Sequence, residues 1–304
     1  MRVLVTGASG FVGSCVVRCL INAGCEVVAL VSPEHPLPRL QAVTGKIQLL
    51  SGRLPLDVTL VKTIKALSPE RCIHLAWNAE PGQYLQSPQN VELLNASLQL
   101  LQALIDAGCQ KVLMVGTCAE YDTRFGYLHE ETPTQPSTLY AACKLSSGLI
   151  AQEIAATAGI QFIWARLFYL YGPWENERRM LPALIRTLLE DRPFPATAGA
   201  QVRDYLQVED AARALCHLLL SDCTGVYNIA SGVPVTIRQL MEMTGRMLGR
   251  SEQIQFGTLP YRQWDPMFIC GNNQKLLSTG WTPQYTIETG LRHTIEWWQG
   301  YLNK

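Results

Sequence analysis

Short apolar runs alternate with longer segments of helical periodicity through the first half of the chain. Runs that are apolar throughout, rather than at every second position, are typical of parallel strands buried on both faces. The predicted strands are Val3–Thr6, Glu26–Val31, Lys46–Leu50, Cys72–Ala76, Lys111–Gly116 and Phe162–Leu167. The predicted helices between them are Phe11–Ala23, Val58–Leu67, Pro88–Ala107 and Thr138–Ala156. This alternation predicts an α/β fold, a doubly wound parallel sheet with helices on both faces.

The pattern changes after about Leu167, where glycine and proline become more frequent. The helices predicted beyond this point are Arg178–Leu189, Val208–Leu220, Thr236–Leu248 and Ile287–Tyr301. We therefore predict a Rossmann-type domain over residues 1–168, joined by a return segment near 203–230. A smaller mixed α/β lobe over residues 169–304 would bind the substrate, with a cleft between the two parts.

Composition narrows the classes of function. Of the 304 residues, 48% are hydrophobic and 16% are charged, and the formal net charge is zero. Without a dense basic run, the sequence favours neither nucleic acid nor a membrane surface as a partner. The chain opens directly into a strand-like run rather than a secretory signal, and it lacks an apolar window of the roughly 18 residues that a membrane helix needs. We expect a soluble, cytoplasmic protein.

The ten cysteines are scattered, without a Cys-x-x-Cys pair or a neighbouring histidine cluster. This spacing predicts no metal site, and we interpret the thiols as reduced and buried. His74, inside an apolar strand, is interpreted as a core residue whose polar atoms have partners.

A glycine-rich turn follows the first predicted strand and opens the first predicted helix. Gly7 would make the turn, Gly10 would allow a pyrophosphate to approach, and Gly13 would allow close helix packing. Backbone N–H groups at the helix start would face the negative charge. This context predicts a nicotinamide dinucleotide site. Its expected residues are Gly7, Ser9, Gly10, Phe11, Val12, Gly13, Val31, Ser32, Arg53, Leu54, Leu75, Ala76, Tyr140 and Lys144.

The end of the second strand bears on the choice of cofactor. NAD sites usually place an acid there to hold the ribose 2′-hydroxyl, but this chain has Val31. A 2′-phosphate would not be repelled, and Ser32 can donate a hydrogen bond to it. Arg39 or Arg53 can also reach it, whereas Glu34 argues the other way. The sequence therefore favours NADP(H), with NAD(H) as the alternative.

A second pattern supplies acid/base chemistry. Tyr140 and Lys144 are four apart in a predicted helix and project from the same face. A lysine cation and an oxidised nicotinamide ring would lower the pKa of the phenol from its usual value of about 10. Thr117 ends a predicted strand at the carboxyl edge of the sheet, where its hydroxyl can bind the substrate oxygen. We predict a catalytic set of Thr117, Tyr140 and Lys144.

Further motifs resemble the extended short-chain dehydrogenases/reductases over almost the whole chain. They are the Gly-x-x-Gly-x-x-Gly turn, Thr117–Tyr121, Glu131–Pro133 with Pro136, Arg166–Pro173, Arg203–Asp210, Asn228–Gly232 and Gly280–Pro283. Together they are specific for NAD(P)-dependent sugar-nucleotide epimerases, dehydratases and ketoreductases. The resemblance implies a nucleotide-sugar substrate. It also implies a homodimer, because the helices around Val91–Leu104 and Tyr140 are apolar on more than one face.

The resemblance extends to the substrate site. Arg203 and Arg262 are candidate clamps for a substrate diphosphate, since a guanidinium donates two parallel hydrogen bonds to phosphate oxygens. Tyr169 stands where the family usually has an asparagine that helps to hold the substrate. Trp77 and Tyr84 follow the fourth strand, and they pack either on the hexose or between the lobes. The expected substrate-binding residues are Trp77, Thr117, Tyr169, Arg203 and Arg262.

Departures from the family select the reaction. Dehydratases place Asp-Glu directly after the threonine, whereas this chain has Cys118 and Ala119, and Glu120 is expected to point to the other side. Dehydration is therefore not expected. We expect NADPH-dependent reduction of a nucleotide-activated 4-keto-6-deoxyhexose. The main alternative is a sugar-nucleotide 4-epimerase with tightly bound NAD. More distant alternatives are a reductase of aromatic or aldehyde substrates and a non-catalytic cofactor sensor.

Overall fold

The computed structural model describes residues 1–34, 36–262 and 265–303. Its main sheet has seven strands in the order β11-β7-β5-β4-β1-β2-β3, and every neighbouring pair is parallel. The strands are β1 (Arg2–Thr6), β2 (Glu26–Val31), β3 (Gln48–Ser51), β4 (Arg71–His74), β5 (Lys111–Thr117), β7 (Gln161–Leu167) and β11 (Gly225–Ile229). The chain winds outward from β1 in both directions, so β1 and β4 meet at the switch point where such folds bind ligands. The predicted doubly wound fold is confirmed.

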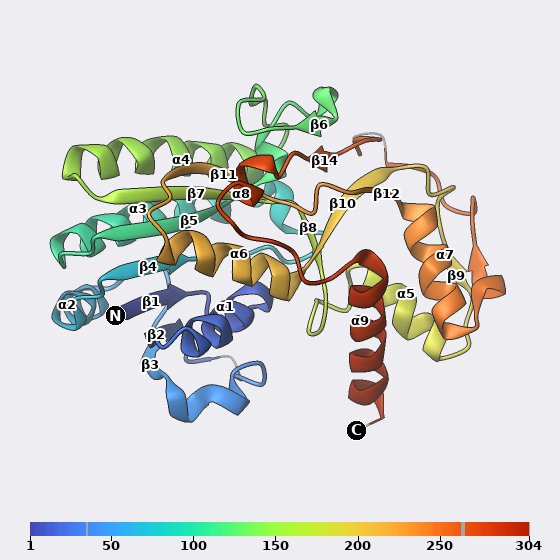
Figure 1. Ribbon diagram of the computed structural model, residues 1–304, viewed down its shortest axis with the longest axis horizontal. Coiled ribbons are helices and arrows are strands. Elements are labelled where there is room, and N and C mark those ends of the chain that lie inside the picture. The colour runs from blue at the N-terminus through green and yellow to red at the C-terminus, as the bar shows by residue number, and fades with distance from the viewer. Residues whose placement is uncertain (35, 263–264, 304) are drawn as a thin grey trace.

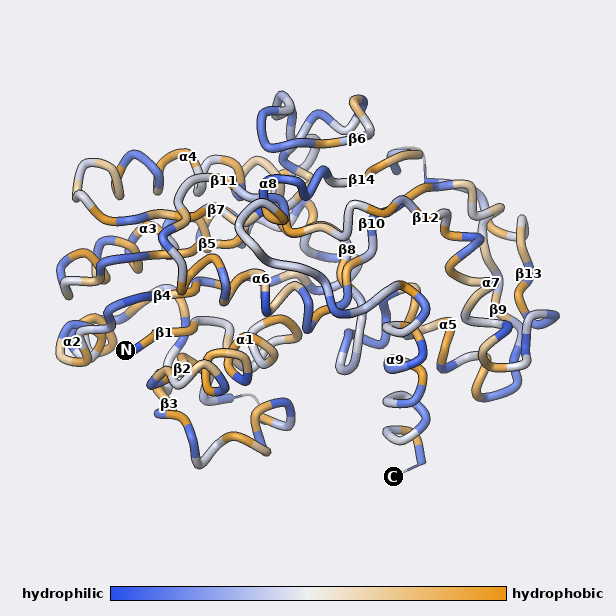
Figure 2. The backbone as a smooth tube through the Cα atoms, in the orientation of Figure 1, coloured by the Kyte–Doolittle hydropathy of each residue, from blue (hydrophilic) through white to orange (hydrophobic). Residues whose placement is uncertain are grey.

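Helices cover both faces of this sheet (Figure 1). One face carries α1 (Phe11–Asn22) and α6 (Val208–Leu220), and the other carries α2 (Val58–Leu67), α3 (Gln89–Asp106) and α4 (Leu139–Ala158). Each face has its own buried apolar cluster. Apolar and polar residues alternate along these helices (Figure 2), as expected when one side of a helix packs on a sheet.

Local signals set the bounds of α4, which carries Tyr140. Thr138 precedes the helix, and its Oγ1 accepts a hydrogen bond from the backbone N–H of Ala141 at 3.2 Å. Gly159 follows the helix with a φ of 69°, the left-handed conformation that ends many helices. Tyr140 is therefore fixed in the first turn of α4, at the end of the helix nearest the carboxyl edge of the sheet.

The rest of the chain forms a smaller lobe beside the sheet (Figure 1). Its helices α5 (Met180–Leu189), α7 (Ile237–Leu248) and α9 (Ile287–Leu302) surround a third buried apolar cluster. A sheet of order β12-β10-β8 joins the lobe to the main sheet. The short elements are β8 (Tyr169–Tyr171), β9 (Phe194–Pro195), β10 (Val202–Gln207), β12 (Pro234–Thr236) and β13 (Ile254–Gln255), together with β6 (Tyr127–Leu128), β14 (Cys270–Gly271) and α8 (Gln274–Leu277). The division at residues 168 and 169 stays a prediction.

Two predicted strands differ from the structure by more than one residue at an end. The strand predicted at Lys46–Leu50 is displaced, because residues Gln41–Lys46 form a 3₁₀ helix and β3 begins at Gln48. This strand lies at the sheet edge and Leu49 is 42% exposed, so its apolar pattern is weak. The strand predicted at Cys72–Ala76 ends at His74, because the chain turns away beside the glycine-rich turn.

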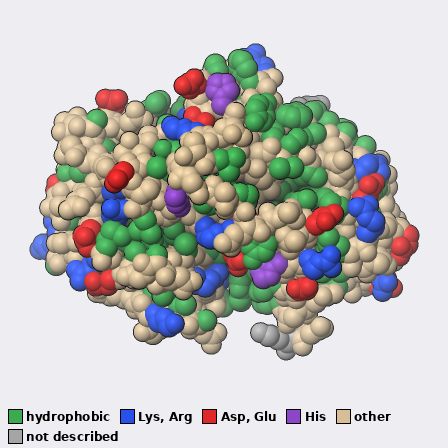
Figure 3. Space-filling model, in the orientation of Figure 1, with side chains coloured by type: hydrophobic (Ala, Val, Ile, Leu, Met, Phe, Trp, Pro, Cys, Tyr) green, Lys and Arg blue, Asp and Glu red, His purple; other side chains and the backbone are tan. Residues whose placement is uncertain are grey.

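The surface bears on the choice of partners. Within the part of the chain that the structure describes, no helix is long and apolar enough to span a bilayer. On the face drawn in Figure 3, basic and acidic side chains are interspersed. That face therefore presents no extended field of one sign, in line with a formal net charge of zero.

Candidate active site

The glycine-rich turn between β1 and α1 leaves no room for side chains at two positions. Gly7 has a φ of +65°, and a Cβ there would lie 2.8 Å from the backbone N of Ala76. A Cβ on Gly13 would lie 2.1 Å from the carbonyl oxygen of Gly7. Gly10 precedes the helix and gives it no side-chain cap. The first N–H groups of α1, at Phe11 and Val12, are thus available to an anion. These residues fit the cradle of a dinucleotide pyrophosphate.

A buried chain of hydrogen bonds joins the ends of β1 and β4 beside the glycine-rich turn. Thr6 Oγ1 accepts from the backbone N–H groups of Leu75 and Ala76, both at 3.2 Å. Its own proton therefore goes to His74 Nδ1, 2.6 Å away. We assign the ring proton to His74 Nε2, which donates to Ser97 Oγ at 2.8 Å. Burial lowers the pKa of His74 to about 3, so the ring is neutral. The interpretation of His74 as a satisfied core residue agrees with this geometry.

The other expected cofactor residues lie at the ends of neighbouring strands. Val31 ends β2 and is 6% exposed, so no carboxylate from this position reaches a ribose. Ser32 follows it and is half-buried. Leu75 and Ala76 follow β4, next to the turn. The remaining two, Arg53 and Leu54, come after β3 at the outer end of the same edge. The structure thus brings this set to one edge of the sheet, and its cofactor contacts stay a prediction.

The three predicted catalytic residues meet where β5 ends against α4. Thr117 is the last residue of β5 and is 9% exposed. Burial raises the pKa of Tyr140, and a hydrogen bond with the Thr117 side chain opposes that rise. Lys144 is 5% exposed, and its Nζ donates to the carbonyl oxygen of Val115 at 2.8 Å. The hydroxyl, phenol and amine therefore occupy one site, as the sequence predicts.

Two aromatic rings from the segment after β4 cover this site. The Trp77 ring lies 3.9 Å from Lys144 Nζ. The Tyr84 ring meets Tyr140 edge-on, with centroids 4.8 Å apart. Asn90 fixes both, since its Oδ1 accepts from Trp77 Nε1 at 2.9 Å and its Nδ2 donates to the Tyr84 carbonyl at 2.7 Å. In this structure the two rings contact the side chains of Lys144 and Tyr140, an arrangement that neither alternative from the sequence included.

Lys144 is buried beneath the Trp77 ring, and this burial affects the pKa of its amine. Burial lowers the pKa of Lys144 to about 7, and the charge of Glu120 opposes this effect. The amine is therefore poised to gain or lose a proton near neutral pH.

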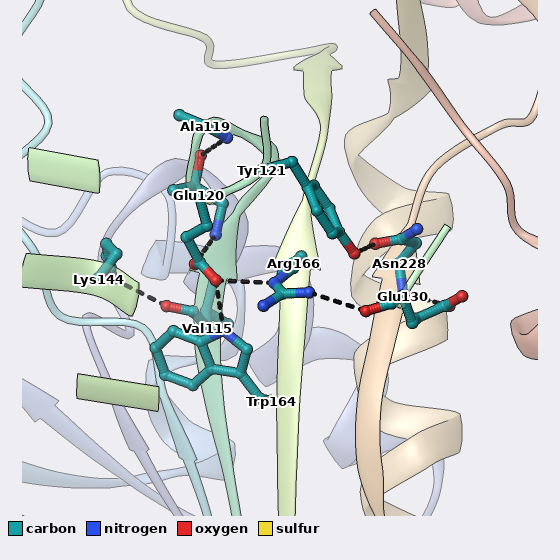
Figure 4. A network of polar contacts seen from close by, with 10 residues as sticks. Val115, Ala119, Glu120, Tyr121, Glu130, Lys144, Trp164, Arg166 and Asn228 are labelled. Carbon is teal, nitrogen blue, oxygen red and sulfur yellow. Dashed lines mark hydrogen bonds and ion pairs between the residues drawn. The ribbon is translucent and has the colours of Figure 1, made fainter. Parts of the chain in front are cut away.

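Glu120 points toward Arg166 and Trp164 (Figure 4). It does so from the 3₁₀ helix Cys118–Glu120, not from the extended backbone on which the sequence prediction rested. Its Oε1 accepts from the backbone N–H of Thr117 at 2.7 Å. Its Oε2 accepts from Arg166 Nε at 2.7 Å and from Trp164 Nε1 at 2.9 Å. The carboxylate is fully buried and all its contacts hold β5 against β7. It therefore positions Thr117 and is not a free acid for the reaction.

This network continues toward β11. Arg166 Nη1 donates to the carbonyl oxygen of Glu130 at 3.3 Å, and its guanidinium lies 4.3 Å from the Tyr121 ring (Figure 4). Tyr121 Oη donates to Asn228 Oδ1 at 2.7 Å. Tyr121, Arg166 and Asn228 lie in the family motifs given above, which assigned them no role. Their task here is to lock the strand ends that carry the site.

Of the predicted substrate residues, Trp77 and Thr117 lie at the site described above, and the other three lie elsewhere. Tyr169 and Arg203 come together, with the Arg203 guanidinium 5.3 Å from the Tyr169 ring. Arg203 is 4% exposed, and its Nη2 pairs with Asp265 Oδ1 at 2.5 Å. Arg262 lies in an exposed segment. A diphosphate at Arg203 would therefore take the place that Asp265 now holds, and the clamp stays a prediction.

A doubly wound sheet with a tight glycine turn and a Thr–Tyr–Lys set defines a nicotinamide-dinucleotide enzyme. Comparison with known proteins supports this class and narrows it. The model of the NAD dependent epimerase/dehydratase family matches residues 3–230. This chain belongs to that family, and it is an enzyme of the sugar-nucleotide epimerase and dehydratase type.

Individual relatives are similar over nearly their full length. A UDP-glucose 4-epimerase of Corynebacterium glutamicum is 26% identical, over 94% of this chain and 92% of the relative. The structure of a UDP-N-acetylglucosamine 4-epimerase from Methanobrevibacter ruminantium has a TM-score of 0.88 at 26% identity, covering 99% of this chain and 98% of that one. MoeE5 in complex with UDP-glucose and NAD has a TM-score of 0.84 at 29% identity, covering 99% and 100%.

Proposed function

We propose that this protein is a 4-epimerase of a nucleotide-activated sugar that works with bound NAD. One observation carries the choice within the family: the carboxylate of Glu120, which contacts Thr117, is already engaged by Arg166 and Trp164. Thr117, Tyr140 and Lys144 remain for chemistry. These three groups suffice to interconvert an alcohol and a ketone, but they offer no second acid for removing water.

The chain's own residues move a proton and hold the sugar oxygen. Bound NAD supplies the hydride acceptor and, once reduced, the hydride donor. The phenolate of Tyr140 takes the proton of the sugar 4-hydroxyl as the carbon is oxidised, and it returns that proton when the 4-keto sugar is reduced from the other face. Thr117 donates a hydrogen bond to the same oxygen. Lys144, as a cation, lowers the pKa of the Tyr140 phenol.

The similarity to 4-epimerases supports this reaction over the reductase that the sequence placed first. An epimerase regenerates its cofactor at each turnover, so retention of NAD agrees with the family's NAD dependence. A preference for NADP, expected from the sequence, has no support from the family. The second candidate remains the 4-keto-6-deoxyhexose reductase, because Val31 supplies no carboxylate to favour NAD over NADP.

Substrate recognition belongs to the same proposal. The nucleotide sugar would lie between the Thr117–Tyr140 site and the smaller lobe. Arg203 would exchange Asp265 for the diphosphate, and Arg262 would approach from its exposed segment. Tyr169 would contact the sugar or the diphosphate from beneath Arg203. Trp77 would move off Lys144 and border the hexose.

A homodimer completes the proposal. On the outer face of α3 and α4, Val91 is 47% exposed, Leu149 60% and Ile150 42%. Exposed aliphatic side chains gathered on two neighbouring helices are typical of an interface. A second copy meeting this face through its own α3 and α4 would cover them.

One experiment separates the candidates. Freshly purified protein is denatured and its nicotinamide content identified, and native protein is then incubated with UDP- and dTDP-hexoses while products are resolved by chromatography. Stoichiometric NAD and conversion of one sugar to its C4 epimer, without net change in nicotinamide absorbance, are expected. Consumption of NADPH with a 4-keto sugar and no C4 exchange would replace the epimerase by the reductase.

A further inference from the structure

Residues 77–86, between β4 and α3, form a segment that is anchored at both ends, and we call it the cover segment. At one end the backbone N–H of Ala76 donates to Thr6 Oγ1 at 3.2 Å. At the other end the carbonyl oxygen of Ser87 accepts from Asn90 Nδ2 at 2.9 Å, and Asn90 is 2% exposed. Between these anchors the segment lies outside every β-strand. Its backbone therefore has no sheet pairing that would hold it in one place.

The cover segment carries the ring that stands against Tyr140. The rings of Tyr84 and Tyr140 meet edge-on with centroids 4.8 Å apart, and the Trp77 ring lies 6.3 Å from that of Tyr140. Asn90 holds Tyr84 by its main-chain carbonyl oxygen. The Tyr84 ring can therefore turn about its own side-chain torsions while this anchor stays in place. Such a turn would uncover the phenol that the proposed reaction uses.

The outer side of the cover segment is tied to the smaller lobe by two arginines that precede α5. Glu80 Oε1 accepts from Arg178 Nη1 at 2.8 Å, and we call this ion pair the latch. The carbonyl oxygen of Ala79 accepts from Arg179 Nη2 at 3.2 Å, and the Arg179 guanidinium lies 5.6 Å from the Tyr84 ring. These hydrogen bonds join residues separated by 98 and 100 positions in the chain. The smaller lobe thus contacts both the backbone of the cover segment and the ring that faces Tyr140.

On the lobe side, the segment that carries Arg178 is firmly held. Trp174 has a φ of 70°, which is rare for a residue other than glycine and requires support from packing. The support comes from α9, since the Trp174 ring lies 4.8 Å from that of Trp297 and 5.6 Å from that of Tyr301. The carbonyl oxygen of Trp174 also accepts from Arg39 Nη2 at 3.0 Å. When the latch breaks, the cover segment is therefore the side that moves.

The latch is weak enough to open during turnover. The side chains of Arg178 and Glu80 are 57% and 38% exposed, and an ion pair in contact with water contributes little free energy and is screened by salt. We propose that the cover segment is a lid over Tyr140, held closed by the latch and opening at that end to admit the sugar. The proposal rests on the catalytic site of the proposed function, whichever reaction that site performs.

Hydrogen exchange and hydroxyl-radical footprinting, both read by mass spectrometry, test the proposal on the full chain. Arg178→Glu or Glu80→Arg places like charges at the latch, so the amides of residues 77–86 should exchange roughly three-fold faster or more. Oxidation of the Tyr140 side chain should rise in the same two variants. In the variant with both substitutions the charges attract again, and both signals should return to the wild-type level. In the wild type, raising NaCl from about 0.05 M to about 0.5 M should also speed the exchange.

Arg192→Glu is the matched control, because it reverses the charge of a similarly exposed arginine that pairs with Glu190 in the same lobe. Its two signals should equal those of the wild type. Three results would overturn the proposal: unchanged exchange in both single variants, faster exchange without added oxidation of Tyr140, or no recovery in the variant with both substitutions. The salt series needs no variant, and exchange that ignores salt would also contradict the latch. No sugar nucleotide enters either assay, so a protein that fails as an epimerase still gives the answer.

Discussion

The centre of the Trp77 ring lies 3.9 Å from Nζ of Lys144, which has one hydrogen bond partner in the Val115 carbonyl. The indole both attracts the cation and keeps water away from it. Desolvation is the larger effect, since burial lowers the pKa of Lys144 to about 7. We therefore expect the protonation state of Lys144, a predicted catalytic residue, to depend on a side chain from a different segment.

We expect Trp77→Ala to raise the pKa of Lys144, because water would reach Nζ. A cationic Lys144 supports catalysis, so the basic limb of the kcat/KM profile, which reports the free enzyme, should move to higher pH. Tyr84→Phe is the matched control, since it leaves the indole over the lysine. A limb that stays in place or moves to lower pH would show that the indole does not set this pKa.

Tyr140→Phe removes only the phenolic hydroxyl. We expect kcat to fall by roughly 100-fold or more, the order of magnitude for an acid/base group, while the cofactor still binds. Steady-state turnover and fluorescence titration with NADH measure the two effects separately. Near-normal turnover in the folded variant would remove Tyr140 from the mechanism.

Glu120→Gln tests the buried pair with Arg166. Arg166 and Glu120 side chains are 7% and 0% exposed, so the substitution leaves a buried cation without its counter-ion. We expect a loss of about 3–5 kcal/mol in the free energy of unfolding, together with a lower kcat because Thr117 loses its anchor. Urea unfolding measures the first effect, with Glu153→Gln on the exposed side of α4 as control. Equal stability of the two variants would contradict the assignment.

Glu175 predicts a pH dependence of stability. Burial raises the pKa of its carboxyl group from 4.5 to about 8, and its Oε2 has no hydrogen-bond partner. The folded state then binds this proton more tightly than the unfolded chain, so the free energy of unfolding falls as pH rises between these values. Glu175→Gln should remove this component. Urea unfolding at about pH 5 and about pH 8 measures the effect. Between these pH values the free energy of unfolding should fall less for the variant than for the wild type. Equal falls for the two proteins would contradict a raised pKa of Glu175.

Leu149→Glu tests the dimer. Light scattering of the wild type at micromolar concentration should give twice the chain mass of 33.8 kDa. The variant places a charge on the exposed face of α4 and should shift the protein toward the monomer. Its secondary structure should be unchanged, because Leu149 is 60% exposed. A wild-type monomer would exclude this interface.

The sequence predicts best those elements whose bounds are set by residues close together in the chain. The predicted helix Val58–Leu67 matches α2 at both ends, because its apolar spacing and the Asp57 cap are close in sequence. Strands β9 and β13 of the smaller lobe have only two residues each, too few to show a periodic pattern. Their pairing follows from the packing of the lobe.

The same distinction holds for the residues of the candidate site. Tyr140 and Lys144 are one turn apart in a helix, so their common orientation follows from spacing alone. Glu120 and Arg166 are separated by 46 positions, and Arg39 and Trp174 by 135. A periodic pattern assigns such residues to faces and edges but does not pair them. The sequence analysis named Glu120, Arg166 and Arg39 separately and did not name Trp174. The two pairs themselves follow from the fold.

The support that Trp174 takes from α9 has a consequence for biosynthesis. Ile287–Leu302 leaves the ribosome after the entire doubly wound sheet. Until Trp297 and Tyr301 emerge, Trp174 lacks the rings that stabilise its backbone, and Arg39 lacks a fixed carbonyl on that side. The glycine turn can therefore form early in synthesis, but the contact between Arg39 and the Trp174 carbonyl is held in place only once α9 has docked.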